Sequence, residues 1–184
     1  MDFDDDRIDK FVTNVGLVTS NGPHGHNIMA CEWTHQVSYS PGMIAVCINH
    51  DAATHANIKS TKEFGVCLAS TEQTALCSVS GNTSKKKTNK IQLLEKLGFS
   101  FYPAEKINAL LVKNAALCIE CKLVQAIELG DHTMFVGEVL AAIATEKEPI
   151  ALHAGKYWKL TKQMPKPSLK KREKVKKLIE QFTE

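Results

Sequence analysis

The clearest candidate for binding chemistry lies at residues 49–55, which read Asn-His-Asp-Ala-Ala-Thr-His. This segment joins a predicted strand at residues 43–48 to a predicted short helix at residues 54–60. The first N–H groups of a helix have no partners within it, and with the helix dipole they favour an anion such as phosphate. Thr54 adds a hydroxyl donor there. An equally good alternative from local sequence is that Thr54 or Asp51 caps the helix.

A second candidate is the polar segment GNTSKKKTNK at residues 81–90. It offers several cations to an anionic ligand, at Lys85, Lys86, Lys87 and Lys90. The segment lacks the G-x-x-x-x-G-K-[ST] spacing of a phosphate-binding P-loop. By itself it is typical of a solvated, charged loop.

The cysteines and the remaining histidines indicate no metal centre. Cys118 and Cys121 form a C-x-x-C, but they fall within a predicted strand at residues 115–129. Side chains three apart on a strand point to opposite faces, so two thiolates there cannot converge on one ion. We expect all six cysteines to be small, reduced core residues. His24 and His26 lie in a Gly/Pro loop, where a solvated imidazole is expected.

Length and composition are those of one ordinary globular domain. The chain has 184 residues, of which 43% are hydrophobic and 23% charged, and these values exclude a disordered chain, a collagen-like fibre and a coiled-coil rod. Its acidic start has no basic region followed by an apolar run, so we expect no secretory signal. Apolar runs stay far below the ~20 residues of a membrane span. We therefore expect a cytoplasmic protein whose thiols are reduced.

The elements that would position these residues are mostly short strands. We expect strands at residues 12–20, 27–38, 43–48, 64–69, 115–129, 133–142 and 157–160, with helices at 54–60 and 71–80 and a helical stripe at Ile91, Leu94 and Leu97. The missing alternation of strand and helix argues against a doubly wound sheet. A closed barrel with helical caps is favoured, because closure leaves no strand edge to protect.

The positive charge is concentrated at the end of the chain. The formal net charge is +3, of which residues 165–184 carry +4 and the body −1. We therefore divide the chain into a domain at 1–164 and a basic helical tail at 165–184. Val175, Leu178, Ile179 and Phe182 form one apolar helix face, which we expect to dock on the body. Nucleic-acid binding by the tail is a weaker alternative, since a short helix with one aromatic residue supports it poorly.

Two long stretches resemble a known family. NIMACEWTHQVSYSPGMIAVCINHDAATHANIKSTKEFGVCL at residues 27–68 and CKLVQAIELGDHTMFVGEVLAA at residues 121–142 are similar to the flavin reductase-like, FMN-binding split barrels. Within that family, Asn-Ile-Met followed by Trp-Thr resembles flavoredoxin. The likeness covers roughly residues 10–160. It implies a mainly β fold, a six-stranded antiparallel split barrel that forms a homodimer and binds one FMN per subunit near the dimer interface.

The resemblance also implies which residues bind the cofactor. Asn27 and Trp33 would lie beside the isoalloxazine ring, and residues 31–36 would line its edge. His132 would approach the flavin, and Tyr157 or Trp158 would offer an aromatic contact. The complete implied set is Asn27, Cys31, Trp33, Thr34, Gln36, Thr54, His55, Asn57, Lys87, Lys90, His132 and Trp158.

In the same resemblance, Thr54, His55 and Asn57 would hold the phosphate end of FMN. Lys90 would be its charge partner. The family often has Asp-Lys-Phe where this chain has Asn89-Lys90-Ile91, so Lys86 and Lys87 stay as alternatives.

The implied function is an oxidoreductase that passes electrons from NAD(P)H or a protein donor, through bound FMN, to an acceptor such as free flavin, a metal complex or a partner protein. The alternative is a non-catalytic FMN-binding electron carrier or redox sensor. No side chain must act as an acid or base, so we assign no catalytic residue. A Rossmann Gly-rich fingerprint is absent from the sequence, so NAD(P)H would have to bind directly over the flavin.

Overall fold

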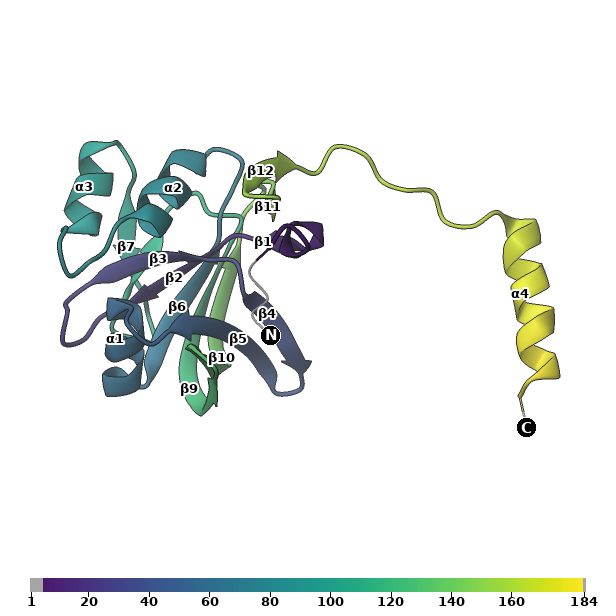
Figure 1. Cartoon of the computed structure of the whole chain (residues 1–184), viewed down its shortest axis with the longest axis horizontal. Helices are drawn as coiled ribbons and strands as arrows, with labels where there is room; N and C mark the ends of the chain where they lie inside the picture. The colour runs from purple at the N-terminus through teal and green to yellow at the C-terminus, as the bar shows by residue number, and fades with distance from the viewer. Residues whose placement is uncertain (1–4, 184) are drawn as a thin grey trace.

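A long hairpin, β9 (Leu117–Leu129) with β10 (His132–Ala144), lies in the middle of the main sheet (Figure 1). The two strands are rich in β-branched residues and pair antiparallel. Gly130 takes a positive φ of 54° in the connecting turn, a conformation that glycine adopts without steric cost. The predicted Gly130-Asp131 turn and both flanking strands are therefore confirmed.

Seven strands form this sheet in a computed structural model that describes residues 5–183. Their order is β3-β2-β6-β9-β10-β5-β4, and all neighbours pair antiparallel. The other strands are β2 (Gly16–Ser20), β3 (Asn27–Cys31), β4 (Thr34–Tyr39), β5 (Gly42–Asn49) and β6 (Glu63–Leu68). The mainly β fold is confirmed, but the expected count of six is not. Residues 27–38, expected as one strand, form two, which lie at opposite ends of the strand order.

Both faces of the main sheet are buried at β2. Leu17 and Val18 are adjacent on β2 and fully buried, yet they belong to two different apolar clusters. One cluster is centred on Phe64 and Phe135 and includes Ile58 of α1 (Ala53–Thr61). The other cluster is covered by α2 (Thr74–Asn82), by α3 (Lys90–Lys96) and by the small hairpin of β7 (Phe101–Pro103) and β8 (Leu110–Val112).

A separate three-stranded sheet borders this second cluster. It consists of β1 (Val12–Asn14), β11 (Ile150–His153) and β12 (Lys156–Lys159), and a short 3₁₀ helix (Ile8–Lys10) precedes it. The stretch at residues 12–20 thus contributes to two sheets rather than one strand, because the chain leaves one sheet for the other at Val15. The strands β7, β8 and β11 were not predicted.

One cysteine pair corrects the expectation of six reduced thiols. Cys67 of β6 and Cys118 of β9 are partners in the strand register and form a disulfide. Cys118 and Cys121 belong to opposite clusters, which confirms that they cannot share a metal ion. Cys31, Cys47, Cys77 and Cys121 are free thiols.

The basic tail forms the predicted helix but does not dock. Helix α4 (Leu169–Gln181) begins at Ser168, whose Oγ accepts a hydrogen bond from the backbone N–H of Lys171 at 3.3 Å. None of its residues is buried, and the apolar stripe is exposed, with Phe182 at 85%. An extended segment at residues 160–168 carries the helix away from the body (Figure 1), so the expected docking is wrong. Among residues 5–183, no helix has the length and apolar character needed to cross a membrane.

Gly137 of β10 is required by packing. A Cβ built there would lie 2.7 Å from Cζ of the fully buried Phe64 and 2.7 Å from Cβ of Cys121. We expect Gly137→Ala to lower the free energy of unfolding by about 1–3 kcal/mol through overpacking. Urea unfolding measures this change. Gly42→Ala is the control, because its nearest neighbour is Val139 at 3.7 Å. Equal stability of both variants would contradict the packing argument.

Candidate functional site

Strand β3 begins at a buried polar contact with the start of helix α1. The Nδ2 of Asn27 donates a hydrogen bond of 2.8 Å to Oγ1 of Thr54, and both side chains are buried. The Oδ1 of Asn27 is buried and has no hydrogen-bond partner among residues 5–183. Thr54 does not cap its helix, since Ala52 occupies the N-cap position without a side-chain hydrogen bond. The capping alternative for Thr54 and Asp51 is therefore wrong, and Thr54 instead ties α1 to β3.

The loop before β3, residues 21–26, is held by one fully buried amide. The Nδ2 of Asn57 donates to the carbonyl of Gly25 at 2.9 Å and to Oγ of Ser20 at 3.2 Å, and its Oδ1 accepts from the backbone N–H of His24 at 3.0 Å. Gly22 packs closely on this residue, because a Cβ there would lie 3.0 Å from the Cα of Asn57. Asn57 thus has partners for its polar atoms and positions the loop.

Lys90 places a buried ammonium group beside the end of helix α2. Its Nζ donates a 3.0 Å hydrogen bond to the carbonyl of Ser80, and its side chain is buried. Burial, with a smaller contribution from the charge of Lys85, lowers the pKa of Lys90 to about 8. Across residues 5–183, no carboxylate forms an ion pair with Lys90. The neighbouring Oγ of Ser80 is also buried, without a hydrogen-bond partner in the described part of the chain.

Burial distinguishes the lysines that the sequence could not rank. Lys86 and Lys87 are exposed, and Lys85 is half-buried with its Nζ 3.5 Å from Oδ1 of Asn89. An anion bound in the interior would therefore meet Lys90 rather than its neighbours.

A cleft of about 320 Å³ lies between β3, the end of α2 and the β11–β12 turn. Ala30 and Cys31 of β3, Gly81 of α2 and Tyr157 of β12 border it. The cleft reaches the lower end of the volumes typical of small-molecule sites, about 300–1,000 Å³. Burial raises the pKa of Cys31 to about 11, so this thiol is neutral near pH 7.

An aromatic pair lies just beyond the end of β3. The ring centroids of Trp33 and His132 are 4.7 Å apart, and their planes are tilted by 53°. Trp33 is 49% exposed, so part of the indole remains free to contact a ligand. The Nδ1 of His132 lies 2.7 Å from Oδ1 of Asp131, and this hydrogen bond lowers the pKa of the Asp131 carboxyl.

Other residues of the expected set lie elsewhere or are already engaged. Thr34 is buried and donates to the carbonyl of Cys31 at 3.1 Å. Gln36 is exposed beside a second cleft of about 410 Å³ between β4, β5, β9 and β10. Trp158 is exposed and donates from Nε1 to the carbonyl of His153 at 3.2 Å.

His55 is directed toward the hairpin rather than toward β3. Its Nε2 lies 2.9 Å from Oγ1 of Thr133 at the start of β10. Burial lowers the pKa of this imidazole, and the nearby His50 and Lys59 add to the effect. Sequence reasoning missed this partner, and likewise Ser80 beside Lys90. Both contacts join distant segments, and the local sequence contained no signal for either.

Comparison with known proteins identifies the family. A model of the flavin reductase like domain matches residues 8–161, so the chain belongs to this family, as its sequence predicted. An uncharacterized protein of Pyrococcus abyssi is 34% identical over 125 residues, which are 68% of this chain and 70% of the relative. An NADH-dependent FAD reductase of Streptomyces globisporus is 27% identical over 133 residues, 72% of this chain and 70% of the relative. The chain spans about two thirds of the length of the first curated relatives that it matches.

Solved structures agree on the fold. The flavoredoxin of Methanosarcina acetivorans superimposes with a TM-score of 0.77 at 24% identity, covering 90% of this chain and 94% of the flavoredoxin. At this identity the comparison concerns the fold alone.

The buried charge of Lys90 should make stability depend on pH in a predictable way. Unfolded lysine keeps its ordinary pKa of 10.5, whereas the folded value is about 8. Below pH 8 both states are protonated and the full cost of burying the charge applies. From pH 8 to 10.5 the unfolded state binds more protons, so stability rises with pH.

In flavin-free protein, we therefore expect Lys90→Met to have a higher free energy of unfolding than the wild type near pH 7, with a difference that shrinks as the pH rises above 8. Urea unfolding of both proteins at each pH measures the difference in their free energies of unfolding. The other titrating groups contribute equally to both proteins, so their contributions cancel. A difference that stays constant up to pH 10 would contradict the conclusion that burial lowers the pKa of Lys90.

Proposed function

We propose that the protein is an FMN-binding flavoprotein oxidoreductase, which passes electrons from NAD(P)H or a protein donor to an acceptor through bound FMN. The observation that carries this proposal is the buried ammonium of Lys90, which has no carboxylate partner in the described part of the chain and lies near β3 of a flavin reductase-like fold. A buried cation without an anion is costly, and a bound phosphate would compensate it.

The polar groups near β3 fit the phosphate end of FMN. Lys90 supplies a cation, and Thr54 supplies a hydroxyl in the first turn of α1, where the helix dipole also favours an anion. The unpartnered Oγ of Ser80 adds a donor beside Lys90. His55 and Asn57 are less suitable, because Thr133 and the 21–26 loop already engage them.

The flavin ring would bind along β3, between Asn27 at its start and Trp33 just beyond its end. The amide of Asn27 carries a buried acceptor without a partner, which suits the mixed donor and acceptor edge of the ring. Trp33 would offer its half-exposed face for aromatic packing, and His132 supports that indole. The neutral thiol of Cys31 would border the ring without adding charge. Flavoredoxin and FMN reductase (NADH) among the similar proteins support FMN as the flavin.

When bound, FMN supplies the two-electron redox chemistry, and the protein supplies binding, orientation and electrostatics. Lys90 and Thr54 would fix one end of the cofactor, and β3 with Trp33 would orient the other. We assign no acid or base to the chain, because none of these roles requires a proton transfer by a side chain.

Lys90→Ala and Thr54→Ala should each weaken FMN binding by about 1–3 kcal/mol, since each removes a contact to a charged phosphate. Titration of the flavin-free protein with FMN, followed by flavin fluorescence, measures this loss. Lys87→Ala is the matched control in the same loop, and its affinity should equal that of the wild type. A loss in Lys87→Ala with none in Lys90→Ala would reassign the phosphate to the exposed lysine.

The visible spectrum and an anaerobic reduction test the function itself. Purified protein should carry flavin absorbance, and added FMN should raise its melting temperature. Rapid bleaching by NADH or NADPH without air supports a reductase, whereas bleaching by a protein donor alone supports an electron carrier. A colourless protein that FMN does not stabilise would refute the proposal.

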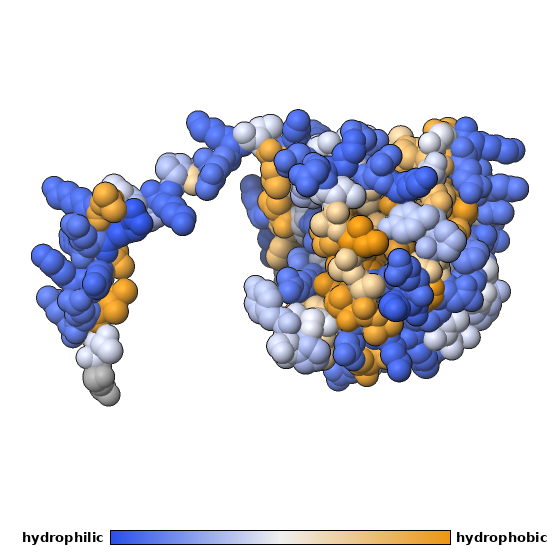
Figure 2. Space-filling view, turned by 180° about the vertical axis from the view of Figure 1, so that it is seen from behind, coloured by the Kyte–Doolittle hydropathy of each residue, from blue (hydrophilic) through white to orange (hydrophobic). Residues whose placement is uncertain are grey.

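We further propose that the protein acts as a homodimer. Figure 2 shows apolar side chains gathered on the face of the body opposite to that seen in Figure 1. Several large hydrophobic side chains on β9 and β10 are 41–50% exposed, namely Val124, Leu129, Leu140 and Ile143. A second copy of the chain would cover this type of surface.

Sedimentation of the purified protein should show a dimer. Leu140→Glu should weaken it, because the new carboxylate would lose its hydration at the interface. Leu97→Glu, on an exposed leucine at the end of α3, is the control and should stay dimeric. A monomeric wild type at micromolar concentration would contradict the dimer.

A further inference from the structure

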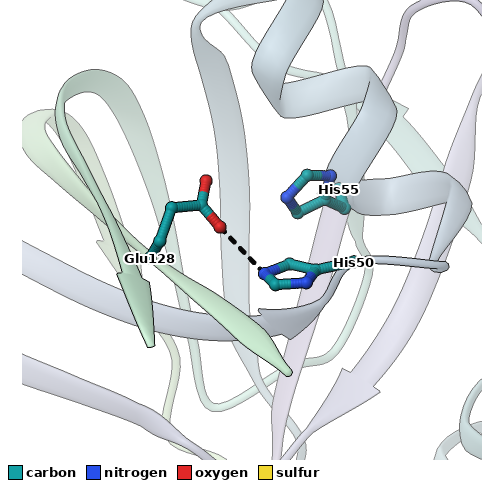
Figure 3. A group of neighbouring side chains, drawn as sticks. All are labelled: His50, His55 and Glu128. Atoms are coloured by element: carbon teal, nitrogen blue, oxygen red, sulfur yellow. Dashed lines mark ion pairs between the residues drawn. The ribbon is translucent and has the colours of Figure 1, made fainter. Parts of the chain in front are cut away.

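Three side chains from distant parts of the chain converge beside the β9–β10 turn (Figure 3). His50 follows β5, His55 lies in the first turn of α1, and Glu128 lies near the end of β9. Each offers one nitrogen or oxygen atom, and these three atoms all lie within 4.8 Å of one another. The cluster draws on three segments. The resemblance implied His55 as a phosphate contact, but its Nε2 is engaged by Thr133, and His50 and Glu128 have no part in the cofactor contacts proposed above.

Short polar contacts already connect the group. The Nε2 of His50 lies 2.9 Å from Oε2 of Glu128. Thr133 donates from Oγ1 to the same carboxylate oxygen at 3.0 Å, and because its single proton is used there, it accepts from the Nε2–H of His55 at 2.9 Å. Thr133 therefore holds the carboxylate of Glu128 and the buried imidazole of His55 next to each other, and a bound ion would replace the proton on the ligating nitrogen of His55.

We propose that His50, His55 and Glu128 form a binding site for a divalent first-row transition metal, with Zn²⁺ as the representative ion. Two imidazoles with one carboxylate suit zinc, iron, nickel or copper, whereas magnesium and calcium prefer oxygen ligands. Three protein ligands leave one position of a tetrahedral ion for water, the arrangement of open zinc sites. Glu128 is far along the chain from the two histidines, so a search for zinc-finger spacing could not find it.

The geometry needs only a small closure of the side chains. With metal–ligand bonds of about 2.0–2.1 Å, ligand atoms of a tetrahedral site lie roughly 3.4 Å apart. His50 and Glu128 already approach more closely than that. Their side chains are 40% and 63% exposed, so both can change rotamer toward a bound ion, while the buried His55 provides the fixed ligand.

A bound ion would clamp the hairpin to the helix. His50 also donates its backbone N–H to the carbonyl of Asp131 at 3.3 Å, so the cluster adjoins the turn that carries His132. The ion would join the end of β5, the start of α1 and the end of β9, three segments that otherwise meet here through hydrogen bonds. Metal binding should therefore stabilise the fold independently of FMN.

Isothermal titration of untagged, EDTA-treated protein with Zn²⁺ tests the site. We expect one equivalent to bind, and we expect His50→Ala and Glu128→Gln each to weaken binding by more than about 100-fold, beyond the effect of losing an outer-shell partner. Both residues are exposed, so these variants should fold. His35→Ala, an exposed histidine on β4, is the control and should bind like the wild type.

Two further measurements make the result decisive. Zn²⁺ should raise the melting temperature of the wild type and of His35→Ala but not of His50→Ala, and Mg²⁺ should raise none of them. The Co²⁺ form should lack a thiolate charge-transfer band, which excludes binding by Cys47. Absence of Zn²⁺ binding in the wild type, or equal binding in all variants, would overturn the proposal and leave a hydrogen-bonded network alone. FMN binding is measured separately, so failure of one proposal does not imply failure of the other.

Discussion

Burial of both faces of the main sheet at β2 and β6 is the constraint on which the rest of the structure depends. A strand with one solvent-exposed face can place polar residues at every second position, but β2 cannot, because Leu17 and Val18 are both fully buried in different clusters. At the ends of such strands, neighbouring helices or loops can satisfy buried polar side chains. Asn27 at the start of β3 and Thr133 near the start of β10 occupy such places.

This constraint explains why buried polar groups with missing partners lie at the rim of the sheet. At the start of β3, the amide of Asn27 donates a hydrogen bond to Thr54, and its Oδ1 has no partner among residues 5–183. On the helical side, Lys90 finds a backbone carbonyl but no carboxylate among residues 5–183. Unsatisfied buried groups are rare in proteins, and a ligand that supplies the missing partners relieves their cost. The rim thus holds both the groups proposed to bind the flavin phosphate and the cluster of His50, His55 and Glu128.

Much of the fold could be predicted from the sequence because its signals are local. The β9–β10 hairpin follows from two long β-branched stretches around Gly130-Asp131, and α1 follows from its position between two apolar strands. The short strands β7, β8 and β11 lack such a signal, since three or four residues cannot establish a period. The prediction that α4 docks on the body was wrong for another reason. An apolar stripe indicates that a helix face will be covered, but it does not say whether the covering surface belongs to the same chain.

The sequence predicted residue types for a binding site, but not which of these residues contact one another. Lys90 could not be separated from Lys87 by sequence, because burial depends on how α2 and α3 pack. The disulfide of Cys67 with Cys118 depends on strand register, and the His55 contact depends on the hairpin reaching α1. Each is a long-range relation, whereas spacing rules describe neighbours along one element.

The amide of Asn57 has a consequence for the cost of binding. Residues 21–26 have no regular secondary structure, yet three hydrogen bonds from this one buried side chain fix the loop and the residue before it. Ordering a loop costs conformational entropy, about 1–2 kcal/mol per residue, whenever it happens. Here that entropy is lost on folding. The loop is therefore already ordered before a ligand binds beside Asn27, and the affinity of that ligand is not reduced by the cost of ordering the loop.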